Sequence, residues 1–202
     1  YVIKQCEEFI HICDGASGKY FLDEDKLQQI DKVLKMLVMP RGLKAGCSIY
    51  ECSCGYQWLF YAAILCVVHR ENSDRRRYET AILEIARKNF KTFTIATIFV
   101  LLFLLEPKFS KFYSVAPDGA LSREVKTAIE EILKSSPLIY LHNERPRFKV
   151  LRDYIQFTPN ENRYVPLNYS NSRMDGKLPN VFLADEVGAL PNSYAIEAMR
   201  SG

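Results

Sequence analysis

TAILEIARKNFKTFTIATIFVLLFLL, residues 80–105, is the part of the chain from which the fold is most easily inferred. Its first part, 81–85, is nearly all apolar, as expected of a parallel strand covered on both faces. A short basic loop follows at 86–90, and Lys91-Thr92 then opens a long apolar run. We therefore predict a buried strand, a turn and a buried helix, in that order.

The loop has the character of a phosphate-binding turn. Free backbone N–H groups of such a turn and of the helix start cradle phosphate oxygens. In this arrangement Lys91 reaches the terminal phosphates and the Thr92 hydroxyl binds Mg²⁺. The standard pattern is G-x-x-x-x-G-K-[ST], and Ile85 and Phe90 stand where its glycines belong. The alternative for this stretch alone is an ordinary strand, a surface turn and a core helix.

A second informative stretch is PNVFLADEVGAL, residues 179–190. Four apolar residues, 181–184, predict a buried strand that delivers Asp185 and Glu186 to its C-terminal end, where ligands bind in open parallel sheets. Asp185 would hold Mg²⁺, and Glu186 would orient and deprotonate the water that attacks the γ-phosphate. Adjacent carboxylates on a straight strand point apart, so one of them must turn. The alternative is a strand followed by a helix that one carboxylate caps.

The segments between these two stretches continue the pattern. KFYSVA, 111–116, predicts a strand, and 121–134 has helical spacing of apolar residues. Strand and helix alternate, which favours an α/β fold with a mainly parallel sheet flanked by helices. Short β-like pieces follow in 145–167, where basic residues face either DNA or solvent: Arg145, Arg147, Lys149 and Arg152.

The N-terminal part predicts helices over 2–12 and 23–39, which we expect to form a lid over 1–45, with the core over 46–202. YQWLFYAAILCVV, 56–68, reads as a further helix. Its Gln57 amide has both a donor and an acceptor and so matches the edge of adenine, although a single glutamine is also common on a polar surface.

Composition limits the classes of protein. A chain of 202 residues with 25% charged and 48% hydrophobic residues is typical of a globular protein with one good core, and its net charge of +3 neither requires nor excludes a polyanionic partner. The longest apolar run, 94–105, is too short to cross a bilayer, which needs about 20 residues, so we expect a buried helix and no membrane partner. No signal peptide is visible, and the six cysteines are too irregularly spaced for a zinc site, which predicts free thiols.

These motifs together resemble the large terminase subunits of tailed bacteriophages, which are ATPases that package DNA. The resemblance covers nearly the whole chain and includes the following segments: the N-terminal helical segment, Gln57-Trp58, IARKNFKT, YSVAPDGALSREVKTAIEEI and SRMDGKLPNVFLADEVGAL. It implies a P-loop NTPase core of the RecA-like (ASCE) type that uses ATP and Mg²⁺. Phe90 departs from the family, which normally has glycine immediately before the lysine.

The resemblance also implies roles for individual residues. Six residues would bind the nucleotide, with Gln57 contacting adenine: Gln57, Arg87, Lys88, Asn89, Lys91 and Thr92. Thr92 and Asp185 would hold the metal. Glu186 would be the catalytic carboxylate, and Arg87 would stabilise the γ-phosphate as an arginine finger does.

The partners implied are double-stranded DNA, the portal protein, the small terminase subunit and further copies in a five-membered ring, all in the host cytoplasm during phage assembly. The family's nuclease domain lies beyond Gly202, so we expect no DNA cleavage by this chain. Lone motor domains often bind partners weakly, so we expect the isolated domain to be monomeric. Two alternatives are open. A helicase-like remodelling ATPase would need a second RecA-like domain. A P-loop-like module with nucleotide binding impaired by Phe90 would bind DNA or a partner protein without turning over ATP.

Overall fold

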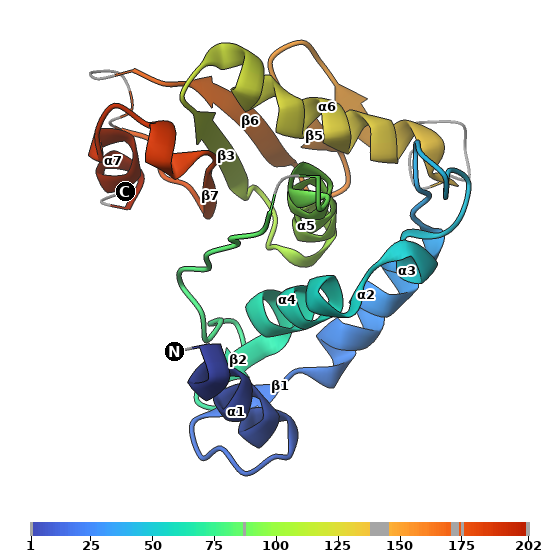
Figure 1. Cartoon of the computed structure of the whole chain (residues 1–202), viewed down its shortest axis with the longest axis vertical. Helices are drawn as coiled ribbons and strands as arrows, with labels where there is room; N and C mark the ends of the chain where they lie inside the picture. Colours follow the sequence, from blue (N-terminus) through green and yellow to red (C-terminus); the bar gives the residue numbers. More distant parts are fainter. Residues whose placement is uncertain (1, 87, 138–145, 171–173, 175, 201–202) are drawn as a thin grey trace. The chain divides into compact units, whose positions relative to one another are not determined.

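The structure is a computed structural model that describes the chain except residues 1, 87, 138–145, 171–173, 175 and 201–202. The chain forms two compact units, Tyr1–Asn89 and Phe90–Gly202. In Figure 1 the first unit runs from blue to green and the second from green to red. The predicted division into a lid over 1–45 and a core over 46–202 stays a prediction.

The first unit is mainly helical. Its elements are α1 (Val2–Cys13), β1 (Tyr20–Leu22), α2 (Glu24–Met36), α3 (Ile49–Cys52), α4 (Gly55–Cys66) and β2 (Val67–His69). The two short strands pair antiparallel, with Tyr20 opposite His69. Asp23 caps α2 by accepting a hydrogen bond from Lys26 N at 3.0 Å. The predicted helices over 2–12 and 23–39 are confirmed, although the second ends at Met36.

One further helix is confirmed and one strand is wrong. The helix predicted over 56–68 forms but ends at Cys66, because Val67 and Val68 pair with β1 as a strand. The strand predicted over 81–85 does not form: residues 80–86 adopt neither helix nor strand, and Ile82 is 83% exposed. An apolar run becomes a strand only where another strand pairs with it, and none of the described strands runs beside 81–85.

The second unit is a mixed sheet with helices on its faces. Its elements are α5 (Lys91–Leu105), β3 (Lys111–Ala116), α6 (Gly119–Ser135), β4 (Phe148–Val150), β5 (Ile155–Phe157), β6 (Asn162–Asn168), β7 (Val181–Ala184), the 3-10 turn η2 (Val187–Ala189) and α7 (Tyr194–Arg200). The strand order is β4-β5-β6-β3-β7. β6, β3 and β7 are parallel, whereas β4, β5 and β6 are antiparallel. The predicted α/β fold is confirmed.

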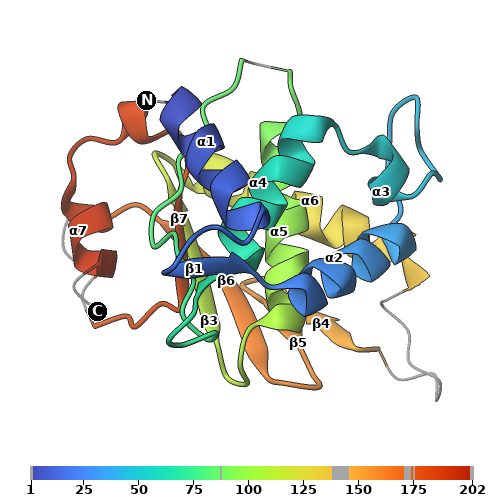
Figure 2. The same cartoon turned by 90° about the horizontal axis from the view of Figure 1, so that it is seen from below.

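Aromatic side chains form the core between the helices and the sheet. Phe99 of α5 lies 4.7 Å from the Tyr164 ring of β6, and Phe103 lies 5.5 Å from both Phe112 of β3 and Phe148 of β4, measured between ring centroids. Since α5 is apolar almost all round, it is largely buried, as its sequence predicts. α6 packs on β3 and β6 beside it (Figures 1 and 2).

α7 covers part of the opposite face of the sheet. Side chains alternate between the faces of a strand, so Val115 of β3 points away from the face that carries Phe112. A buried cluster joins Val115 to Ala195, Ala198 and Met199 of α7. α7 therefore covers this face around Val115, near the C-terminal end of β3.

None of the described helices combines the length and apolar composition needed to cross a membrane. All six cysteines are free, as predicted.

Candidate active site

The C-terminal edge of the parallel strands carries the predicted carboxylates. Asp185 N donates to Val115 O at 2.9 Å, which continues the pairing of β7 with β3 by one residue. Asp185 therefore lies directly after β7, at the edge where the sequence places it. At the end of β3, Asp118 accepts hydrogen bonds from Ala120 N at 2.8 Å and Leu121 N at 2.9 Å, and so caps α6 at the same edge.

Lys91, the first residue of α5, meets both carboxylates. Its Nζ lies 2.5 Å from Glu186 Oε1 and 3.1 Å from Asp185 Oδ1. The structure thus brings together a loop lysine and a carboxylate pair that are about half the chain apart in sequence. Partial burial lowers the pKa of Lys91, but the hydrogen bonds to Glu186 and Asp185 raise it more, so its pKa lies above the ordinary value. The lysine is therefore a full positive charge at neutral pH.

A left-handed backbone at Glu186 explains how two adjacent carboxylates reach one ammonium. Glu186 has φ 49° and ψ 46°, and its N–H donates to Asp185 Oδ1 at 2.9 Å. This turn reverses the direction of the second side chain. The expected turn after the strand is confirmed.

The predicted phosphate loop has left-handed backbone angles that glycine usually adopts, although it contains no glycine. Phe90 has φ 60° and ψ 27°, and Lys88 has φ 67°. L-residues rarely adopt this region, and glycine adopts it freely. The Phe90 ring is 64% exposed, while its carbonyl oxygen accepts from Thr94 N at 2.8 Å and from Thr94 Oγ1 at 2.9 Å. The turn therefore forms with phenylalanine in the position of the glycine.

Three of the predicted nucleotide-binding residues belong to the described part of the first unit. Gln57, in the first turn of α4, is buried and its Oε1 accepts from Cys54 N at 2.8 Å. Asn89 Nδ2 donates to Ala86 O at 3.1 Å within the loop, and Lys88 is exposed. The predicted finger, Arg87, lies outside the described residues. The roles of all four stay predictions.

Tyr56 is a loop contact that the sequence did not suggest. Its hydroxyl donates to Asn89 O at 2.8 Å, so the residue before Gln57 holds the end of the loop to the start of α4. The only feature of the sequence that points to this contact is the position of Tyr56 next to Gln57.

Two predicted metal ligands, Thr92 and Asp185, have the oxygen donors that Mg²⁺ takes. Among the described residues, no group of three or more His, Cys, Asp or Glu is placed to hold a metal ion. Mg²⁺ takes one or two carboxylates and keeps several waters. Thr92, in the first turn of α5, and Asp185 supply hard oxygen donors of that kind.

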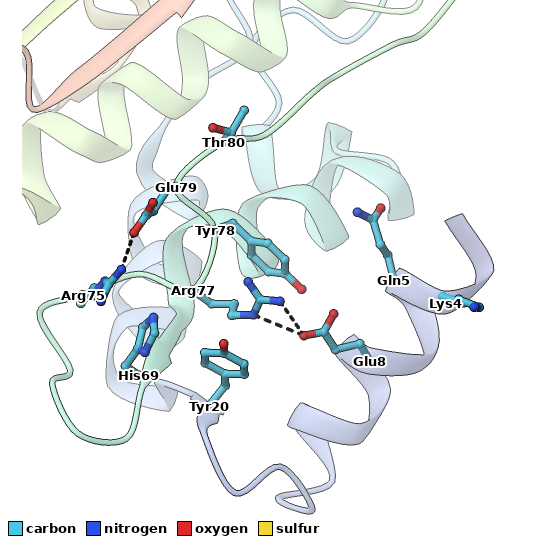
Figure 3. Close-up of a pocket in the computed structure, with 10 residues that line it drawn as sticks. All are labelled: Lys4, Gln5, Glu8, Tyr20, His69, Arg75, Arg77, Tyr78, Glu79 and Thr80. Carbon is cyan, nitrogen blue, oxygen red and sulfur yellow. Dashed lines mark hydrogen bonds and ion pairs between the residues drawn. The ribbon is translucent and has the colours of Figure 1, made fainter. Parts of the chain in front are cut away.

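A cavity of about 550 Å³ lies elsewhere in the first unit (Figure 3). Arg77 dominates it: its guanidinium lies 4.5 Å from the Tyr20 ring and 5.0 Å from the Tyr78 ring, and it donates to Glu8 Oε1 at 3.0 and 3.3 Å. Through these contacts Arg77 holds the segment that precedes the loop against α1 and β1.

A mixed, partly parallel sheet flanked by helices is the fold class of P-loop NTPases, and in this chain a left-handed turn precedes Lys91-Thr92 while an Asp-Glu pair follows β7. The sequence matches the family "Terminase large subunit, ATPase domain" over residues 59–202, and the chain belongs to this family.

A solved structure agrees in fold. The crystal structure of the HK97 bacteriophage large terminase is similar with a TM-score of 0.65 and 19% sequence identity, over 86% of this chain and 34% of that chain. The chain thus spans about a third of that terminase. No curated protein matches the sequence.

Proposed function

We propose that the chain hydrolyses ATP with Mg²⁺ and that this reaction drives double-stranded DNA into a phage procapsid. The family supports a packaging ATPase. The observation that carries the proposal is the convergence of Lys91 with Asp185 and Glu186, at 3.1 and 2.5 Å, on the C-terminal edge of the sheet.

Nucleotide binding would exchange partners at this lysine. The γ-phosphate is an anion that competes with the two carboxylates for the Lys91 ammonium. When Lys91 turns to the phosphate, Glu186 loses its ion pair and becomes available as a base. Half of the Glu186 side chain is exposed, which leaves it room to move. Binding therefore prepares the catalytic group.

In the hydrolysis step, the proton that water loses goes to Glu186. Glu186 accepts a proton from water, the water oxygen attacks the γ-phosphorus, and the bond to the bridging oxygen breaks so that ADP leaves with the electron pair. Thr92 and Asp185 would hold Mg²⁺, which when bound neutralises phosphate charge. Gln57 would contact adenine, Lys88 and Asn89 the phosphates, and Arg87 the transferring group.

The wider assembly is also proposed. The small terminase subunit, the portal protein and further copies in a ring would act with this chain on DNA in the host cytoplasm. Membership of the terminase family supports these partners, because DNA packaging requires them.

The test is calorimetry with Mg²⁺ and a non-hydrolysable ATP analogue, together with phosphate release from ATP. We expect binding by the unmodified chain, its loss in Lys91→Ala, and retained binding without phosphate release in Glu186→Gln. Removing a catalytic base typically costs about 10²- to 10⁴-fold in rate. Phosphate release by Glu186→Gln at the rate of the unmodified chain would refute the role of Glu186.

The second candidate is a module that binds DNA or a partner with impaired nucleotide binding, and Phe90 favours it. A Cβ in this turn approaches the place where phosphate oxygens would lie. Calorimetry on Phe90→Gly and Phe90→Ala separates the candidates. Binding by the unmodified chain supports the ATPase. Binding in Phe90→Gly alone supports the impaired module and identifies the residue responsible.

A further inference from the structure

On the sheet face opposite α5 and α6, Lys111 and Arg163 are exposed at the N-terminal ends of the parallel strands β3 and β6. α7 covers this face around Val115. In the half near these ends the strand register places four polar residues in one row across neighbouring strands, of which Gln156 is buried: Lys149, Gln156, Arg163 and Lys111. Residues paired in register project on the same face. Lys111, Lys149 and Arg163, which we name the basic face, are all exposed.

The three cations of the basic face are not neutralised within the described structure. None of them forms an ion pair with a described acidic residue. The acidic side chain next to the row, Glu161, accepts a hydrogen bond from Gln156. The charges of the basic face are therefore available to an anion.

Aromatic rings hold two cations on this face. The Arg163 guanidinium lies 4.3 Å from the Tyr154 ring, and Lys177 Nζ lies 5.7 Å from the Tyr113 ring. Such contacts fix the direction of long side chains that would otherwise be disordered in water. They also occupy the ring faces on which the bases of single-stranded nucleic acid would stack.

Two further polar atoms near the edge of the row lack a hydrogen-bond partner. Arg147 Nε and Thr158 Oγ1 are both buried and unpaired in the described structure. Thr158 N donates to Arg147 O at 2.7 Å, so the two residues are neighbours where β4 begins and β5 ends. Unpaired buried polar atoms are uncommon in proteins and call for an explanation.

We propose that the basic face contacts the phosphate backbone of double-stranded DNA. This inference rests on the proposed packaging function and adds the surface that DNA would touch. Strands about 4.8 Å apart space the three cations over about 14 Å, which suits two or three phosphates. Occupied ring faces and point charges match a duplex, whose bases are stacked and whose phosphates face outward.

The basic face and the nucleotide site lie at opposite ends of the same strands. Lys111 begins β3, whereas Asp185 pairs beyond Val115 near its end. DNA and nucleotide would therefore not compete. β3 joins the two sites directly, so a shift of β3 on nucleotide binding would reach the DNA.

The test measures fluorescence anisotropy of a labelled duplex with the full 202-residue chain, without nucleotide, over a series of salt concentrations. The variant is Lys111→Gln/Lys149→Gln/Arg163→Gln. The control is Lys134→Gln, which removes an exposed charge from α6 on the other face. We expect the triple variant to bind at least about tenfold more weakly at low salt and to flatten the slope of log K against log[salt] by about 3. The control should differ by less than twofold.

Equal affinity and equal slope in the triple variant and in Lys134→Gln would overturn the proposal. So would equally tight binding of poly-glutamate or of a single strand at the same salt, since either shows a partner other than duplex DNA. Calorimetry with the ATP analogue on the same variant separates the two proposals. If the triple variant binds the analogue and its DNA slope equals that of the unmodified chain, the basic face alone is refuted. If the unmodified chain does not bind the analogue, the proposed function is refuted, and the DNA result is unaffected.

Discussion

Residues with a left-handed backbone are concentrated at the candidate site. Of the five described non-glycine residues with positive φ, three belong to it: Lys88, Phe90 and Glu186. Each costs of order 1 kcal/mol or more and persists only where the surroundings require it. At Glu186 the strained turn directs the carboxylate to Lys91, so the strain has a clear structural purpose. At Phe90 it sets the start of α5.

The strain at Phe90 predicts a gain in stability on substitution. Phe90→Gly removes a left-handed side chain whose ring is mostly exposed, so little burial is lost. The relief of about 1–2 kcal/mol is partly offset by the greater freedom of unfolded glycine, about 0.5–1 kcal/mol. We expect the free energy of unfolding in urea to rise by up to about 1 kcal/mol.

Phe109 supplies a matched control for this prediction. It also has a left-handed backbone, φ 69°, and is 70% exposed, but it is remote from the loop in sequence. Phe109→Gly should give a similar change in stability and no change in nucleotide affinity. A nucleotide affinity raised equally by both substitutions would show that the effect is not local to the loop.

At the scale of elements, a buried hydroxyl pair joins β3 to β6. Ser114 Oγ lies 2.6 Å from Tyr164 Oη, and both residues are almost fully buried. Tyr164→Phe leaves the Ser114 hydroxyl without this partner, which should cost about 1–2 kcal/mol in urea unfolding at pH 7. In Tyr164→Phe/Ser114→Ala part of this cost should return. Strictly additive single effects would contradict the pairing.

Because Tyr164 is buried, we expect the free energy of unfolding to fall at alkaline pH. Burial raises the pKa of Tyr164 above its usual value near 10, since the neutral hydroxyl is favoured in the folded state. This contribution is fully present below about pH 10 and is lost as pH rises through the folded-state value. The stability gap between the unmodified chain and Tyr164→Phe should therefore narrow above pH 10.

A second element-scale prediction concerns Arg77, which lies between two rings and against Glu8. Lysine keeps the charge but loses the flat stacking and the two-pronged hydrogen bond, so Arg77→Lys should destabilise the first unit by about 1 kcal/mol. Arg75→Lys, two residues away in an exposed pair with Glu79, should cost almost nothing. The chain has a single tryptophan, Trp58, so its fluorescence reports the unfolding of this unit.

Elements with a long and unambiguous pattern were predictable from sequence. The helix after Lys91 and the strand 111–116 were correct, because a 15-residue apolar run is longer than an ordinary strand, whereas a 6-residue run with aromatic residues before a Pro-Asp-Gly turn fits one. The strand at 81–85 was not, since a strand depends on a neighbour that its own residues do not specify. The same limit applies at the site: the string Asp185-Glu186 placed the carboxylates at a strand end, but the ion pairs to Lys91 depend on backbone angles that the string does not encode.

For the molecule as a whole, bound nucleotide should have its largest effect on the exposed segment near the end of the first unit. Residues 80–86 have no regular structure, and Glu84 is exposed there. Exposed irregular segments are preferred sites of proteolysis. A protease specific for glutamate should therefore cut first near Glu84 and give two fragments whose boundary lies within about six residues of the boundary between the compact units.

Nucleotide should slow this cleavage. The segment leads directly into the loop at 86–90, which would be ordered by phosphate contacts, and a protein that binds a ligand in one state only is stabilised in that state. We expect protection by Mg²⁺ and the ATP analogue in the unmodified chain and none in Lys91→Ala. An unchanged cleavage rate in a chain that binds the analogue by calorimetry would mean that the loop is already held without phosphate, with Tyr56 and Asn89 as the contact that holds it.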